Sequence, residues 1–253
     1  MPTPSESQDQ PTWPSILTTA KHTPRTSTPK PDLPSAEQQS LIDALRSLPL
    51  TNPPDSNSDA DQSDLKAAIA DILSEYEDED ESSTSTESRN ESKKEKEQWE
   101  NLHAFLAFIT KESIVRLEDV GIHVLRVALE RGEHHHYHHS HHQQGPAVGV
   151  PPGTGKRKKM AVFVSCAAIW ALVMGEELWE RRHETEEFPV GLSLSLSPSP
   201  RESGAAGDAA ATVSKSRWQM WIDRFQFLSL ADDLDIKTRE LAAEAAAVMR
   251  RVT

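Results

Sequence analysis

The sequence predicts an all-α protein: an irregular helical bundle of about five long and two shorter helices, interrupted by long disordered inserts. Apolar residues recur at three- and four-residue spacing over most of the chain, which is the period of a helix that buries one face. The one segment with strand-like alternation, residues 192–196, has no evident pairing partner. Hydrophobic residues make up 36% of the 253 residues, with 17 prolines, below the roughly 45–50% typical of globular chains. Part of the chain is therefore expected to lie outside the core.

The N-terminal third is expected to hold a tail followed by short helices. Residues 1–34 contain eight prolines and few apolar side chains, which predicts a disordered Pro/Ser/Thr tail. Residues 35–252 are expected to form a single helical domain. Its first helix starts at a capping box made by Ser35 and Gln38 and ends before Pro49. A second helix is predicted over about residues 61–76, where five apolar residues form one stripe.

Three biased segments are predicted to interrupt the helical domain. Residues 77–92 form an acidic linker, in which like charges repel each other. Residues 133–156 form a loop rich in His, Gly and Pro, and residues 185–213 form a loop rich in Ser, Pro and Ala. None of these compositions supplies enough apolar surface for a packed core.

The remaining helices are expected to supply most of the core. Apolar faces run from Trp99 to Ile109 and from Ile114 to Ala128, and the short connection between them predicts an antiparallel pair. The run from Met160 to Met174 contains only Ser165 as a polar residue, so it should form a central helix surrounded by protein. Two more helices follow, one around residues 218–228 and a last one capped by Asp235.

Charge and motifs exclude several classes of protein. Residues 1–98 carry 20 acidic and 9 basic side chains, a net of −11, and residues 99–253 carry 20 and 18, a net of −2. This balance argues against a nucleic-acid binder. The N-terminus lacks the features of a signal peptide, and no apolar run reaches the roughly 20 residues of a membrane span. We therefore expect an intracellular protein without a membrane partner, cytoplasmic or, given the basic run Lys156 to Lys159, nuclear.

Motifs for nucleotides and metals are present only in fragments. The stretch from Pro151 to Lys156 resembles a phosphate-binding loop, but the first glycine, the magnesium-binding hydroxyl and the preceding strand are missing. Seven histidines lie between His134 and His142, which gives weak metal affinity without the fixed geometry of a site. We predict no cofactor and no metal site, and interpret both segments as loop.

A pair of Glu-x-x-His motifs and the single cysteine are not predicted to form reactive sites. Glu100-x-x-His103 and Glu180-x-x-His183 have the spacing of di-iron carboxylate proteins. On a helical wheel, however, Glu100 lies about 160° from the apolar face, so both motifs are expected to point outward. Cys166, the single cysteine, excludes an intramolecular disulfide and is expected to be a small buried hydrophobe. No catalytic residue is predicted.

One aromatic and basic segment is the candidate binding site. Arg217, Trp218, Trp221 and Arg224 share one side of a predicted helix. They could form a partner- or ligand-binding rim beside an aromatic pocket. The alternative is structural: the arginines stack on Trp221 and reach a carboxylate such as Glu130 on a neighbouring helix.

The same segment carries a resemblance to a known family. The residues concerned are Trp99 with Phe105, Ala128 to Glu130, Ala167 to Trp170, Arg217 to Phe225, and Ala245 to Met249. Together they resemble a family of uncharacterised all-helical proteins of filamentous fungi, a domain of unknown function, over roughly residues 95–252. The strongest part is the Arg-Trp-x-x-Trp-x-x-Arg-Phe stretch. The resemblance implies an all-α domain with variable loops and implies no activity.

The sequence favours a non-enzymatic function, a helical module that binds an unidentified protein partner. The support is limited to the charged and flexible segments, which commonly bind partners. The alternative is an enzyme or small-ligand-binding protein that uses a pocket between the Trp-rich helices. An exposed apolar surface would favour the first, and a closed apolar cavity with convergent polar groups would favour the second.

Overall fold

The computed structural model describes residues 12–25, 32–47, 59–78, 89–130, 154–180 and 206–253. Within these ranges it contains helices and no strand, so the predicted all-α class is confirmed. The helices are α1 (Trp13–His22), α2 (Ala36–Arg46), α3 (Asp59–Asp78), α4 (Arg89–Lys111), α5 (Glu118–Glu130), α6 (Thr154–Glu180), α7 (Ala206–Ser229) and α8 (Ile236–Arg251).

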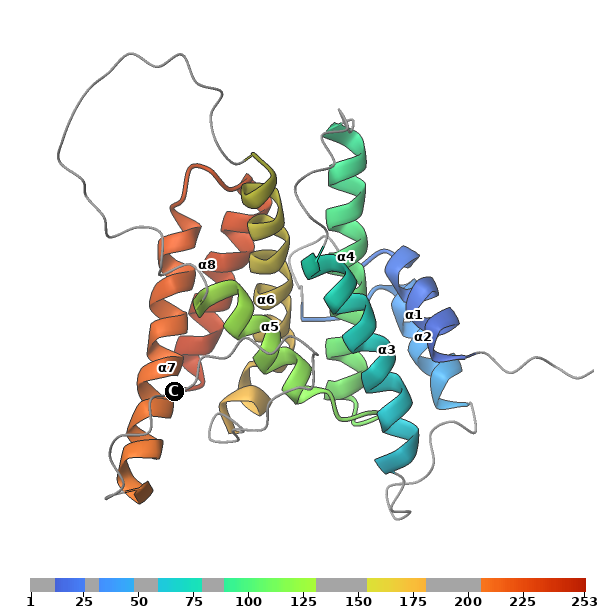
Figure 1. Cartoon of the computed structure of the whole chain (residues 1–253), viewed down its shortest axis with the longest axis horizontal. Helices are drawn as coiled ribbons and strands as arrows, with labels where there is room; N and C mark the ends of the chain where they lie inside the picture. The colour runs from blue at the N-terminus through green and yellow to red at the C-terminus, as the bar shows by residue number, and fades with distance from the viewer. Residues whose placement is uncertain (1–11, 26–31, 48–58, 79–88, 131–153, 181–205) are drawn as a thin grey trace, which may run out of the picture.

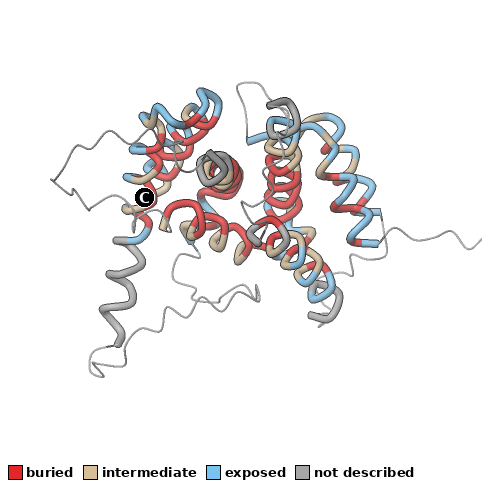
Figure 2. Tube along the Cα trace, turned by 45° about the horizontal axis from the view of Figure 1, so that its top comes forward, coloured by how far each residue is buried: buried red, intermediate tan, exposed pale blue. Residues whose placement is uncertain are grey.

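Helix α6 lies at the centre of the bundle. It packs against α4, α5 and α8, while α7 packs against α8 and α1 packs against α4 (Figure 1). The helix faces turned toward neighbours are buried and the outer faces are exposed (Figure 2). The apolar run from Met160 to Met174 is thus the central helix that its composition predicts. The helix bends at Met174, where φ is −119° and ψ is 19°.

The length of α6 corrects one expectation. The segment Lys159–Glu180 has 22 residues, and an 18-residue stretch within it has a mean hydropathy of 1.7, so by length and composition it is long and apolar enough to cross a membrane. The expectation that no apolar segment of this chain is long enough to span a membrane is therefore wrong. In the structure, 78% of that 18-residue stretch is buried. Such burial is typical of the core helix of a bundle.

Helix α1 overturns part of the predicted disordered tail. Residues 1–34 were expected to lack an apolar stripe, yet Trp13, Ile16, Leu17 and Ala20 are buried at the spacing i, i+3, i+4, i+7. Pro14 lies in the first turn, where its missing N–H costs no hydrogen bond and its fixed φ favours the helix. The prediction is wrong for α1, while residues 1–11 and 26–31 lie outside the described residues.

The predicted helix starts agree with the structure at two caps. The Ser35 side chain accepts a hydrogen bond from the Gln38 N–H, and the Asp235 side chain accepts one from the Thr238 N–H. These bonds satisfy backbone donors that the first helical turn leaves unpaired.

The three inserts are shorter than predicted. Residues 77–78 belong to α3, residues 89–92 to α4, residues 154–156 to α6 and residues 206–213 to α7. Those parts of the predicted linker and loops are therefore helical. The remainder of the three segments, residues 79–88, 133–153 and 185–205, lies outside the described residues, as do the histidine run and residues 151–153 of the phosphate-loop-like stretch.

Close packing of α5 on α6 depends on a glycine. A Cβ built on Gly121 would lie 2.7 Å from Cε3 of Trp170, which is too close for any side chain. Trp170 itself is fully buried. The absence of a side chain at Gly121 therefore lets the indole lie against the α5 backbone.

Candidate functional site

The predicted aromatic and basic segment lies on α7, and its tryptophans are buried. Trp218 is 1% exposed and donates its indole N–H to the carbonyl oxygen of Met249, 3.2 Å away, near the end of α8. Trp221 is 2% exposed and donates to Oε1 of Glu130 at 3.0 Å. Nε of Arg217 lies 3.2 Å from the same oxygen. The predicted carboxylate partner Glu130 is confirmed, and it joins α5 to α7.

The second arginine of the segment has a different environment. The guanidinium carbon of Arg224 lies 5.2 Å from the ring centroid of Phe227, within cation–π range. Its Nε atom is buried and has no hydrogen-bond partner among the described residues. Of the four predicted rim residues, Arg217 is exposed and Arg224 is half-buried, whereas Trp218 and Trp221 belong to the core.

Beyond this segment, three large apolar side chains between the end of α7 and the start of α8 are exposed. Phe227 is 61% exposed, Leu230 is 80% exposed and Ile236, across the connection to α8, is 65% exposed. We call these three residues the turn surface. Leu228 in the last turn of α7 and Leu234 in the connection to α8 are buried, at 4% and 6% exposed. The connection thus places some of its large apolar side chains in the core and leaves others in solvent.

A network of charged and polar side chains joins the N-terminal segment to α4 and α8. Arg25 donates to Oε2 of Glu100 at 2.8 Å, and the Lys96 ammonium lies 3.5 Å from the other oxygen of Glu100. Lys96 also donates to Asp235 at 2.7 Å and to the hydroxyl of Thr238 at 2.6 Å. Partial burial raises the pKa of Asp235, but the hydrogen bonds from Lys96 and Thr238 outweigh it and hold that pKa below its usual value.

Glu100 and His103 correct the helical-wheel prediction. Both were expected to point outward, yet Glu100 is 6% exposed and His103 is 2% exposed. The wheel assumed one apolar face, whereas α4 is covered by α6 on one side and by α1 on another. In the second motif, Glu180 is exposed and His183 lies outside the described residues. No cluster of three or more His, Cys, Asp or Glu with metal-binding geometry occurs among the described residues.

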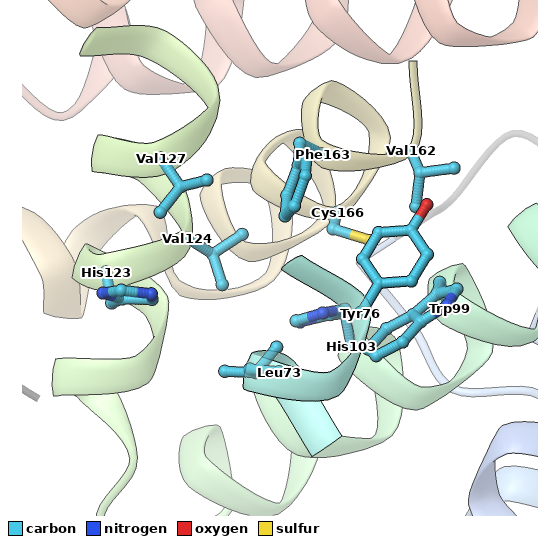
Figure 3. A pocket seen from close by; sticks show the side chains of 10 residues that line it. All are labelled: Leu73, Tyr76, Trp99, His103, His123, Val124, Val127, Val162, Phe163 and Cys166. Carbon is cyan, nitrogen blue, oxygen red and sulfur yellow. The ribbon is translucent and has the colours of Figure 1, made fainter. Parts of the chain in front are cut away.

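His103 and Cys166 line a small cavity between α3, α4, α5 and α6 (Figure 3). His103 accepts a hydrogen bond at Nδ1 from the indole N–H of Trp170, at 3.0 Å. Burial lowers the pKa of His103 to about 3, with a smaller contribution from His123, so the imidazole is neutral at ordinary pH. The lining residues are Leu73, Tyr76, Trp99, His103, His123, Val124, Val127, Val162, Phe163 and Cys166.

The cavity is too small and too inert to act as a reaction site. Its volume is about 10 Å³, close to the minimum that one water molecule needs. Burial raises the pKa of the Cys166 thiol, and the Glu100 carboxylate adds to the effect, so the sulfur is held as a thiol rather than as the nucleophilic thiolate. The cavity is also separate from α7, where the sequence placed the alternative ligand pocket.

Three features of the site were missed by sequence reasoning. Arg25 fell within the predicted tail, the turn surface follows the rim residues by only a few positions, and His103 shares a cavity with Cys166 although they are distant in sequence. The signal for the turn surface was present, because Phe227 and Leu230 extend past the apolar stripe of α7.

Comparison with known proteins places the chain in a family. The model of the family "Protein of unknown function (DUF3632)" matches residues 13–225, so the chain belongs to this family. The predicted resemblance to a domain of unknown function is confirmed, but the match starts at α1, far before residue 95. It ends at Phe225, so α8 and the residues of the turn surface lie beyond it. No curated protein and no solved structure is significantly similar to the chain.

Proposed function

We propose that this member of the DUF3632 family is a protein-interaction module that binds its partner on the turn surface of Phe227, Leu230 and Ile236. The observation that carries the proposal is the exposure of these three large apolar side chains, between 61% and 80%, within ten residues of chain. A gathering of large apolar side chains in solvent is a feature of binding sites rather than of ordinary surface.

The surroundings of the turn surface indicate the chemistry of the partner. Among residues 223–240, the acidic residues Asp223, Asp232, Asp233, Asp235 and Glu240 are exposed, whereas Lys237 is the one exposed cation and Arg224 and Arg239 are half-buried. Asp232 also pairs with Arg239, whose Nη1 lies 3.4 Å from its carboxylate. The excess of exposed acidic side chains along this stretch favours a protein segment with apolar residues flanked by Lys or Arg.

The rigid core beneath the surface supports this role. Leu228 and Leu234 anchor the connection, and Asp235 caps α8 while accepting from Lys96. A surface held by a rigid support binds at a lower entropic cost than one that must become ordered first.

Site-specific photocrosslinking tests the proposal. A photoreactive amino acid is introduced at Leu230 and, as a matched control, at Leu33, which is 51% exposed and precedes α2 in the chain. Helix α2 lies on the other side of the molecule from α7 (Figure 1). We expect a defined protein to crosslink at position 230 and not at position 33. Equal labelling at both positions, or a crosslinked dimer of this chain at 230, would contradict a distinct partner.

Binding of the purified crosslinked partner then gives the quantitative test. We expect Leu230→Asp to raise the dissociation constant by about tenfold or more, while Leu33→Asp leaves it within about twofold. Circular dichroism of both variants should match the unmodified chain, because both side chains lie in solvent. Unchanged affinity of Leu230→Asp would exclude the turn surface as the binding site.

A further inference from the structure

Thr23 is placed where a modifying enzyme can reach it. It ends α1 with φ −85° and ψ 112°, the extended conformation that a residue before proline prefers. The Thr23 hydroxyl donates to the Thr19 carbonyl oxygen at 2.9 Å in a solvent-exposed hydrogen bond; Thr23 itself is half-buried and Pro24 is exposed. An extended hydroxyl-proline pair at the surface is the substrate that a proline-directed protein kinase accepts.

The residues around Thr23 are basic. Lys21 and His22 form the last turn of α1, and Arg25 follows two positions after Thr23. Arg25 binds residues of α4. Its Nε and Nη2 donate to Oε2 of Glu100 at 3.2 and 2.8 Å, and its backbone N–H donates to Oδ1 of Asn101 at 2.9 Å. Arg25 therefore fastens the end of α1 to α4.

A phosphate on Thr23 would act against this attachment in two ways. It would add negative charge at the C-terminal end of α1, where the helix dipole disfavours it. It would also offer strong acceptor oxygens two residues from Arg25, in competition with the Glu100 carboxylate. Glu100, whose side chain is only 8% exposed, would then keep Lys96, 3.5 Å away, as its remaining cation.

We propose that Thr23 is a phosphorylation site and that its phosphate releases α1 from α4. A proline-directed kinase transfers the γ-phosphoryl group of ATP: the bond from phosphorus to the ADP oxygen breaks and the bond to Thr23 Oγ1 forms. The hydroxyl proton passes to the kinase's base. The phosphate then takes Arg25 from Glu100, and the buried face of α1, with Ile16 and Leu17, leaves the side of α4.

The test uses the full chain with a single such site. The sequence contains four other hydroxyls directly before proline, at Thr3, Thr28, Ser197 and Ser199, and each is changed to alanine. Incubation with a proline-directed kinase and ATP should add one phosphate at Thr23, measured by mass spectrometry. Amide exchange in α1 should then accelerate by roughly 10- to 100-fold, the factor for losing one hydrogen bond between charged partners. Exchange in α8 should stay unchanged.

Two variants distinguish the effect of the phosphate on amide exchange from a general destabilisation of α1. Thr23→Val removes the bond to Thr19 without adding charge, so exchange in α1 should change by less than about threefold. Arg25→Gln should accelerate exchange before any kinase is added, and phosphorylation should then add little, because the same attachment is already lost. No incorporation at Thr23 in the folded chain, or a phosphorylated chain with unchanged exchange in α1, would overturn the proposal.

Discussion

Helices α1 and α7 both bury tryptophan, but they are held in different ways. On α7, the indoles of Trp218 and Trp221 each make a hydrogen bond to another helix, and the rings lie 5.9 Å apart. On α1, Trp13 is 9% exposed, and the end of the helix is held by Arg25 and Asn101. The difference shows that α7 is part of the core, whereas α1 is a peripheral helix that packs on the outer side of α4. We call such a peripheral helix a cover.

The largest effect is expected at the α7 core. Trp218→Ala should lower the free energy of unfolding by about 3–5 kcal/mol, because it leaves a cavity beside Trp179 and Trp221. Trp218→Phe, which keeps most of the volume and loses the bond to Met249, should cost less. Chemical denaturation measures both variants. A loss below about 1 kcal/mol for Trp218→Ala would mean that α7 is also a cover.

A smaller and local effect is expected on α1. Leu17→Ala should cost about 2 kcal/mol or more for the docking of α1, since Leu17 is 1% exposed. Hydrogen exchange should accelerate in α1 while α6 and α8 stay protected, because the cover can open without the core. Thr18→Ala, at an exposed position of the same helix, serves as the control. Uniform acceleration in every helix would show that α1 unfolds only together with the core.

Acid should weaken the core through His103, which lies on the helix that α1 covers. The pKa of His103 is about 3 in the folded chain and near 6.5 when unfolded, so the unfolded chain binds a proton that the folded chain does not. The free energy of unfolding therefore falls as the pH drops from about 6.5 toward 3. At pH 5 the loss should be about 2 kcal/mol.

Urea titrations at pH 7.5 and pH 5 measure this effect. His103→Gln should remove most of the pH-dependent loss, because an amide can still accept from Trp170 and does not titrate. His22→Gln, at an exposed position of α1, should leave the loss unchanged. If His103→Gln retains the full loss, another group causes it.

The smallest effect is a gain, at the end of α4. Ser113 has φ 57°, in the left-handed region, and the N–H of Ile114 closes the helix end on the carbonyl of Ile109 at 3.0 Å. Glycine adopts this conformation without strain, so Ser113→Gly should stabilise the chain by roughly 0.5–1 kcal/mol. Ser113→Ala is the control and should give no gain. Thermal unfolding distinguishes the two.

The N-terminal segment shows why composition misled the prediction. Eight prolines among residues 1–34 dominate any average over that stretch, and they obscure the ten residues of α1. One of those prolines, Pro14, stands in the first turn, where proline supports a helix. The apolar spacing from Trp13 to Ala20 was readable, but a window short enough to detect it is also short enough to give false helices.

The candidate site was predicted in part. The structural alternative expected an arginine of this segment to reach Glu130, and Arg217 does so. The hydrogen bond from Trp221 to the same carboxylate was not predicted. The inward position of Glu100 was not predictable from a wheel, since the polar side of α4 is covered by Arg25 from the N-terminal segment.

The sequence by itself determined the helical class, the central apolar helix and the caps at Ser35 and Asp235, because each depends on residues within a few positions of one another. The tertiary structure alone decided which polar side chains are buried and which apolar ones are exposed. Glu100 is buried because Arg25 and Lys96 meet it there, and Leu230 is exposed because no described helix covers the end of α7. Both outcomes depend on contacts between distant segments, which local spacing does not encode.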